Sequence, residues 1–201
     1  MAKMVAEATG LPYLDTGAMY RCVALQSMRE GVEASDEVAI AHLAQTANIS
    51  VEGTQSWLND EDVSHLIRSS DIASIVSVIA AHSPVRTAMR SQQQNWIRHH
   101  GGGVVEGRDI GTVVFPDAEV KIFLTASPEE RAIRRVGQSG GDIATVAAGI
   151  AERDRIDSER SDSPLRPADD AIVVDSTGVD ISSVVSTIVG HFHARSGGHG
   201  G

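Results

Sequence analysis

Two adjacent charged residues, Arg108 and Asp109, stand near the middle of the stretch from Val104 to Asp117. The β-branched residues before them and the glycines on either side predict a buried strand that ends at a loop. Such loops are where open α/β sheets bind ligands. A guanidinium fork suits phosphate, and a neighbouring carboxylate accepts hydrogen bonds from amino or hydroxyl groups. The pair therefore predicts a site for a small anionic ligand.

A second group of polar residues follows a short predicted strand at residues 12–14. Asp15 or Thr16 can cap a helix, which places Tyr20 and Arg21 about one turn into it. Tyr20 could pack on a planar group while Arg21 reaches an anion. A surface arginine beside a half-buried tyrosine accounts for the same residues equally well.

Three further charged residues, Arg153, Asp157 and Arg160, recur at i, i+4 and i+7 of a predicted helix over residues 143–160. This spacing places them on one face. A flexible glycine break at Gly137–Gly141 precedes the helix, and a charged helix on glycine hinges is typical of a lid that closes over a phosphate-bearing ligand. An ordinary salt-bridged helix is the alternative interpretation.

Strands alternating with helices predict an α/β fold, a mostly parallel sheet with helices on both faces. The strand at residues 120–124 is apolar enough to be buried on both faces. A core domain is expected from residues 1–30, 83–136 and 166–194. Its further expected elements are helices at residues 2–9, 85–100 and 180–194, a capping box at Ser127–Glu130 and strands at residues 104–105 and 171–175.

The middle of the chain, residues 31–82, is expected to be an inserted lobe. A helix over residues 36–47, a hairpin around Gly53 and a helix over residues 60–82 are predicted in it. Ser77 in this lobe and Arg86 just after it are polar site candidates, although each alone also fits a solvated helix residue. Residues 137–165 are expected to form the lid, and the glycine-rich tail, residues 195–201, is expected to be disordered.

Composition narrows the class of protein. The net charge of −10, from 17 basic and 27 acidic residues among 201, excludes a general nucleic-acid binder or membrane-surface protein. Cys22 is the only cysteine, so an internal disulfide is impossible. With no signal peptide and no long apolar run, a cytoplasmic monomer is expected. No metal-ligating set of side chains is predicted.

Three ordered motifs resemble those of one family. They are Asp15–Arg21, Glu106–Pro116, and Glu152–Arg160 with Ser163–Leu165. The chain resembles the bacterial cytidylate kinases, which are nucleoside monophosphate (NMP) kinases. The resemblance implies a P-loop NMP kinase fold, in which a parallel sheet is flanked by helices and carries an NMP-binding lobe and a lid. It covers nearly the whole chain.

The resemblance implies transfer of the γ-phosphoryl of ATP to CMP or dCMP, with Mg²⁺. The residues that it places at the CMP phosphate are Arg21, Arg108 and Arg160. Those that it places at the cytosine edge are Ser77, Arg86 and Asp109. Those at the sugar are Thr16, Arg153 and Asp157, with Tyr20 beside the nucleotide. The catalytic residues implied, near the transferring phosphoryl group, are Arg108, Arg153 and Arg160.

One family element is absent, because the 201 residues contain no G-x-x-x-x-G-K-[ST] loop to hold ATP phosphates. The strand before that loop is also missing, which should leave an unpaired strand edge beside Val104. Three interpretations remain open. The given sequence omits a segment, a partner chain supplies the strand, or the chain is a truncated, catalytically inactive module that binds CMP without turning over ATP.

Overall fold

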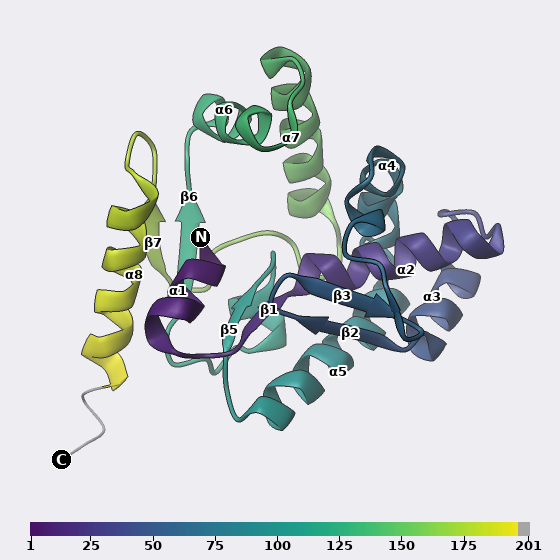
Figure 1. Cartoon of the computed structure of the whole chain (residues 1–201), viewed down its shortest axis with the longest axis horizontal. Helices are drawn as coiled ribbons and strands as arrows, with labels where there is room; N and C mark the ends of the chain where they lie inside the picture. The colour runs from purple at the N-terminus through teal and green to yellow at the C-terminus, as the bar shows by residue number, and fades with distance from the viewer. Residues whose placement is uncertain (197–201) are drawn as a thin grey trace. The chain divides into compact units, whose positions relative to one another are not determined.

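The structure is a computed structural model that describes residues 1–196, apart from the side chains of Gln138, Ser139 and Ser196. The chain divides into two compact units (Figure 1). The "10–107 unit" comprises those residues together with Ala2. The "108–196 unit" comprises the described residues from Arg108 onward together with Met1 and residues 3–9. Each unit is described by itself.

A strand and the helix after it open the 10–107 unit. Strand β1 (Tyr13–Asp15) leads directly into α2 (Thr16–Glu30). The Asp15 side chain caps the helix by accepting from the Ala18 N–H over 3.1 Å, so the predicted cap is confirmed. Strand β1 pairs in parallel with β5 (Val104–Glu106), and Tyr13 lies opposite Val104. Among the described residues, β5 pairs with no other strand, as expected for its second edge.

The lobe between these strands contains α3 (Glu37–Thr46) and an antiparallel sheet of β2 (Ile49–Glu52), β3 (Gln55–Leu58) and β4 (Glu61–Asp62). The predicted hairpin is confirmed. A continuous helix over residues 60–82 is wrong, because β4 and a 3₁₀ turn at Leu66–Arg68 precede α4 (Ser70–Ile79). The Asp62 carboxylate accepts from the backbone and the hydroxyl of Ser64, and this local bonding competes with helix.

Helix α5 (Ser83–His100) ends at three glycines, as predicted. Gly101 has φ +72° and Gly102 has φ +148°, values that favour glycine. A Cβ on Gly103 would lie 2.8 Å from the Trp96 ring and 3.1 Å from the Pro12 carbonyl oxygen. The glycine run therefore both ends the helix and lets β5 approach β1.

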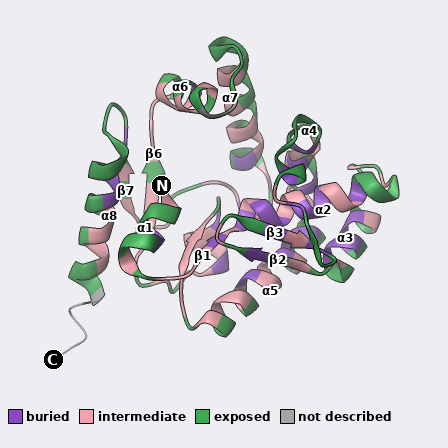
Figure 2. Cartoon of the chain, viewed as in Figure 1, coloured by how far each residue is buried: buried purple, intermediate pink, exposed green. Residues whose placement is uncertain are grey.

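The hydrophobic core cluster of the structure lies in the 10–107 unit, where buried residues gather on α2, the lobe and α5 (Figure 2). Its fully buried members include Leu14, Val23, Ile40, Leu58 and Met89. In the described part of the chain no single helix is long and apolar enough to cross a membrane. Helices α4 and α5 meet that test only when joined, and the chain bends by 102° between them.

The 108–196 unit is built on a parallel pair of strands, β6 (Ile122–Thr125) and β7 (Ile172–Asp175). Helix α6 (Pro128–Ser139) packs against α7 (Ile143–Glu159). The predicted capping box is confirmed, because the Ser127 hydroxyl accepts from the Glu130 N–H over 3.2 Å. Helix α8 (Ile181–Ser196) follows β7, while α1 (Ala2–Thr9) comes from the start of the chain.

Three expectations for this unit need correction. Strand β6 is not buried on both faces, because Leu124 is 42% exposed and among the described residues β6 pairs with β7 alone. The expected break at Gly137–Gly141 shrinks to Gly140 and Gly141, since Gly137 lies within α6. Arg195 and Ser196 belong to α8 rather than to a disordered tail, and residues 197–201 lie outside the described part. The α/β class with parallel strands and flanking helices is confirmed.

Candidate functional site

Three arginines of the 108–196 unit surround one carboxylate, that of Asp157. Arg108 donates from Nε to Oδ2 over 2.9 Å, and Arg160 donates from Nη1 to Oδ1 over 3.2 Å. The Nε of Arg153 lies 3.9 Å from Oδ2. Asp157 is only 5% exposed. The structure thus brings together four of the predicted site residues, which we call the Asp157 cluster.

The end of α7 gives the Asp157 cluster its geometry. Asp157 and Arg153 lie one turn apart on the helix, but Arg160 has left it, with ψ 141°. The predicted single helical face is therefore wrong at its last member. Arg160 Nε donates to the Ser163 carbonyl over 2.7 Å, and the Leu165 N–H donates to the Asp157 carbonyl over 2.7 Å. The loop after α7 folds back onto the cluster and fixes Arg160 there.

The guanidinium groups that gather in the Asp157 cluster suit an anion. Three guanidinium groups face the one carboxylate of Asp157. The side chains of Arg108 and Arg153 are 38% and 40% exposed, whereas that of Arg160 is 6% exposed. A ligand can therefore reach two arginines directly. Planar, permanently charged forks of this kind suit a phosphate.

Asp109 differs from its neighbour Arg108 in being buried, with 8% of its surface exposed. A π-helical turn over Ile110–Val114 follows it, and the Val113 N–H donates to the Asp109 carbonyl over 2.9 Å. The sequence pattern gave no sign of this turn. Its backbone hydrogen bonds hold the Asp109 carbonyl.

In the 10–107 unit, Thr16 and Tyr13 connect the ends of β1 and β5. The Thr16 hydroxyl, 4% exposed, donates to the Glu106 carbonyl over 2.6 Å. The Tyr13 hydroxyl donates to the Glu106 carboxylate over 2.6 Å. Burial, together with that carboxylate, raises the pKa of Tyr13 well above its usual range. Glu106 belongs to a recognised motif, but nothing in the local spacing identified Tyr13 as its partner.

The structure also brings Tyr20 and Arg86 together in this unit. The Arg86 guanidinium carbon lies 6.0 Å from the centre of the Tyr20 ring, at the limit for a cation–π contact. Arg86 is 3% exposed, and its Nη1 donates to the Ala80 carbonyl over 3.0 Å. Arg21, the residue after Tyr20, and Ser77 in α4 are half-buried. A buried arginine beside an aromatic ring can present polar atoms to a planar ligand.

One ion pair between α6 and α7 could not be expected from the sequence. Arg131 on α6 makes a two-pronged ion pair with Asp154 on α7, one prong measuring 3.0 Å. The hydrogen bond to Asp154 raises the pKa of Arg131. The two residues are 23 positions apart, so no helical spacing connects them. The pair joins α6 and α7, the helices before and after the glycine break that was predicted as a hinge of the lid.

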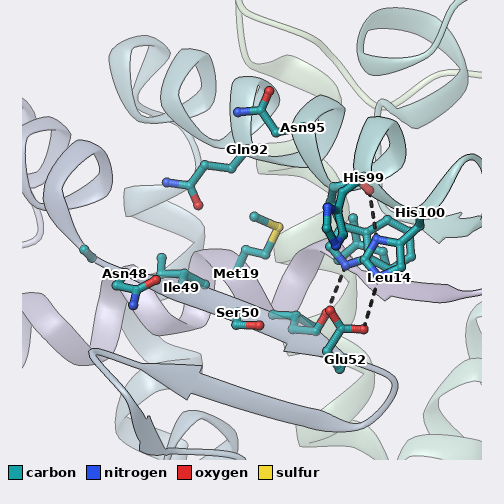
Figure 3. A pocket seen from close by; sticks show the side chains of 13 residues that line it. Leu14, Met19, Asn48, Ile49, Ser50, Glu52, Gln92, Asn95, His99 and His100 are labelled. Atoms are coloured by element: carbon teal, nitrogen blue, oxygen red, sulfur yellow. Dashed lines mark hydrogen bonds and ion pairs between the residues drawn. The ribbon is translucent and has the colours of Figure 1, made fainter.

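A cleft of about 460 Å³ lies between β2 and α5 in the 10–107 unit (Figure 3). It contains none of the predicted site residues. Its polar groups bond to one another: Trp96 Nε1 donates to the Val51 carbonyl over 3.2 Å, and His100 Nε2 lies 3.6 Å from Glu52. These contacts leave the predicted residues as the better candidate site.

Acidic residues and histidines do not gather into a cation site in the part of the chain that the structure describes. In the described residues, no three His, Cys, Asp or Glu side chains are placed to hold a metal ion. Mg²⁺ is usually bound through one or two carboxylates together with substrate phosphates, so it does not require such a cluster.

Comparisons with known proteins agree with the motifs. The family model "Cytidylate kinase" matches residues 1–194. A cytidylate kinase of Bacillus velezensis is 43% identical over 94% of this chain and 88% of its own length. A bifunctional pantoate ligase/cytidylate kinase of Trichormus variabilis is 47% identical over 97% of this chain. The chain spans only 39% of that longer relative. With its parallel strands and flanking helices, the chain belongs to the cytidylate kinase family and has the NMP kinase fold.

Proposed function

We propose that this protein transfers the γ-phosphoryl group of ATP to CMP or dCMP, giving CDP or dCDP. The observation that carries the proposal is the Asp157 cluster, in which Arg108, Arg153 and Arg160 converge on one carboxylate. Membership of the cytidylate kinase family supports the same reaction. Both substrates are small nucleotides.

The arginines would act through position and charge. Phosphoryl transfer needs the reacting oxygens aligned, positive charge at the equatorial oxygens and water excluded, with little covalent help from the protein. In the proposal, Arg108 and Arg160 hold the CMP phosphate together with Arg21, while Arg153 and Arg160 approach the transferring group. Asp157 keeps the guanidinium groups oriented, and no general base is required.

The base would be selected by three polar side chains, two of them buried. Cytosine presents an exocyclic amino donor where uracil presents a carbonyl acceptor. A buried carboxylate such as that of Asp109 accepts from the first and repels the second. Arg86 and Ser77 would donate to the ring acceptors of cytosine. These three residues are proposed as the specificity determinants.

The sugar would lie near Thr16, Arg153 and Asp157, with Tyr20 against the nucleotide. In the proposal, the Asp157 carboxylate binds the arginines in the absence of CMP and also accepts from a sugar hydroxyl when CMP is bound. Mg²⁺ would accompany the phosphates of ATP, which supply the oxygen ligands that it prefers, and no step is assigned to it.

A coupled assay of ADP release tests the proposal. The protein is given ATP and Mg²⁺ with CMP, dCMP or UMP. Turnover with CMP or dCMP, and slower turnover with UMP, is expected. No turnover with any pyrimidine monophosphate would refute the proposal.

A second candidate function comes from a different observation. The 201 residues contain no G-x-x-x-x-G-K-[ST] loop, whose backbone amides and lysine hold ATP phosphates in P-loop enzymes. A module that binds CMP without turning over ATP fits this sequence. Calorimetric titration separates the candidates: CMP binding without ATP binding favours the inactive module, and ordinary ATP affinity excludes it.

A further inference from the structure

Strand β2 lies at one edge of the lobe's sheet, because among the described residues it pairs with β3 alone. Ile49 lies opposite Leu58 on β3. Just before them, the Asn59 N–H donates to the Asn48 carbonyl over 2.8 Å. Opposed residues of an antiparallel pair alternate between those that exchange hydrogen bonds and those whose backbone groups point away. The backbone N–H and C=O groups of Ile49 and Val51 therefore point away from β3.

This edge of β2 borders the cleft between β2 and α5 (Figure 3). The Val51 carbonyl accepts from Trp96 Nε1 over 3.2 Å, so the edge faces α5. Gln92, one turn earlier on α5, donates instead to the Ala44 carbonyl over 3.0 Å. Among the described residues, no side chain or loop backbone group bonds the Ile49 N–H or C=O. An unpaired strand edge beside a cleft can take one more strand.

The two faces of β2 differ in character. Val51 is 3% exposed and Ile49 packs against the core cluster, whereas Ser50 and Glu52 are exposed. Side chains of an added strand would alternate between the same two faces. Every second side chain would therefore lie beside apolar residues, and the others would lie on the face that carries Glu52.

The charge of the cleft favours a basic partner. The residues that line it include the carboxylate of Glu52 and no lysine or arginine. His100 Nε2 lies 3.6 Å from that carboxylate, but His100 Nδ1 donates to the Trp96 carbonyl over 2.9 Å. A neutral imidazole carries one proton, which this bond uses, so none remains for Glu52. The net charge of −10 adds a long-range attraction for cations.

We propose that the cleft between β2 and α5 binds an extended peptide segment of another protein, in which apolar and basic residues alternate, as an added strand on β2. The backbone of Ile49 and the N–H of Val51 hold the peptide backbone, and Glu52 binds one of its basic side chains. The cleft contains none of the residues proposed for CMP, so this site is separate from the nucleotide site. Shielding of the strand edge by α5 is the simpler interpretation, and it requires no binding.

A capped, fluorescent hexapeptide of alternating valine and lysine tests the proposal, by anisotropy titration of the whole chain. The same peptide methylated at every backbone nitrogen keeps the charge but loses its donors. It should bind about tenfold more weakly or worse, the scale of lost backbone hydrogen bonds. Glu52→Gln should weaken the unmethylated peptide about two- to fivefold, as expected for a partly solvated ion pair.

Two variants at one position separate backbone pairing from side-chain packing. Ile49→Pro removes the outward N–H and leaves the bonds to β3 intact, so it should weaken binding about tenfold. Ile49→Val is the matched control, because it shortens the side chain and keeps the N–H; its affinity should stay within about twofold of wild type.

Amide hydrogen exchange of the wild-type protein locates the added strand. The peptide should slow exchange at Ile49 and Val51 and leave Ser50 unchanged, because Ser50 lies opposite Trp57 and already bonds within the sheet. This alternation distinguishes a paired strand from a peptide that is held by charge alone.

Three results would overturn the proposal: no binding of the unmethylated peptide, equal binding of the methylated one, or unchanged exchange at Ile49 and Val51. A dimer in sedimentation that Ile49→Pro dissociates would also overturn it, because a second copy of the chain would then cover the edge. If Ile49→Pro does not fold, the two peptides and the exchange measurement on the wild-type protein decide.

Discussion

The Arg108 Nε–H donates to Asp157 Oδ2 over 2.9 Å, across 49 positions of sequence. This bond joins the loop after β5 to the end of α7 within the 108–196 unit. With Arg160 on the other oxygen, Asp157 holds two guanidinium groups at fixed positions. The Asp157 carboxylate therefore keeps guanidinium groups together that would repel one another without it.

Asp157→Asn should destabilise the protein and weaken the site together. The amide keeps the shape but removes the charge that balances three arginines. We expect a loss of roughly 1–3 kcal/mol in the free energy of unfolding, because two of the arginines remain partly solvated. Urea denaturation measures the loss. Glu152→Gln, which alters an exposed ion pair on the same helix, should have little effect; an equal loss there would contradict the role given to Asp157.

Asp109→Ala should damage base discrimination more than folding. Without a buried acceptor for the cytosine amino group, the preference for CMP over UMP in kcat/KM should fall about 10-fold to 100-fold. Asp117→Ala, on an exposed residue of the same loop region, is the control. A CMP/UMP ratio unchanged in Asp109→Ala would show that the base is read elsewhere.

The Cys22 thiol should resist alkylation until the protein unfolds. Burial raises the pKa of Cys22 from 9.0 to about 12, so its folded thiol stays neutral at pH 8.5. Iodoacetamide labelling should be slow in buffer and fast in urea, and Cys22 is the only cysteine that can react. Fast labelling of the folded protein would contradict the buried, neutral thiol.

The same shift makes folding sensitive to alkali. The folded thiol holds its proton at pH values where the unfolded thiol has lost it. Its contribution to stability is therefore fully present below about pH 9 and is lost as the pH rises toward 12. Urea midpoints measured between pH 8 and pH 11 should fall. Constant midpoints across that range would be inconsistent with this linkage.

Local chemistry was predictable from the sequence, because it depends on near neighbours. The caps at Asp15 and Ser127 and the Glu130–Arg134 pair involve residues three or four positions apart. The end of α5 at Gly101 follows from backbone freedom alone. Each of these features follows from the types of residues that lie close together in the sequence.

Distant partnerships were not predictable in this way. Arg131 contacts Asp154, and Arg134 contacts Ser176, only in the folded unit, where α6 packs against α7 and the turn after β7. Arg160 lies just beyond α7, where its guanidinium donates to the Ser163 carbonyl. The exposure of Leu124 depends on how many strands flank β6, which an apolar run alone does not reveal.

The phosphate-binding role of Arg108 can be measured by comparing CMP with cytidine. Calorimetry gives both affinities, for the wild type and for Arg108→Ala. Loss of this charged contact should weaken CMP binding by roughly 2–4 kcal/mol and leave cytidine binding nearly unchanged, so the preference for CMP over cytidine collapses. An identical preference in the two proteins would contradict the assignment of the Asp157 cluster to the acceptor phosphate.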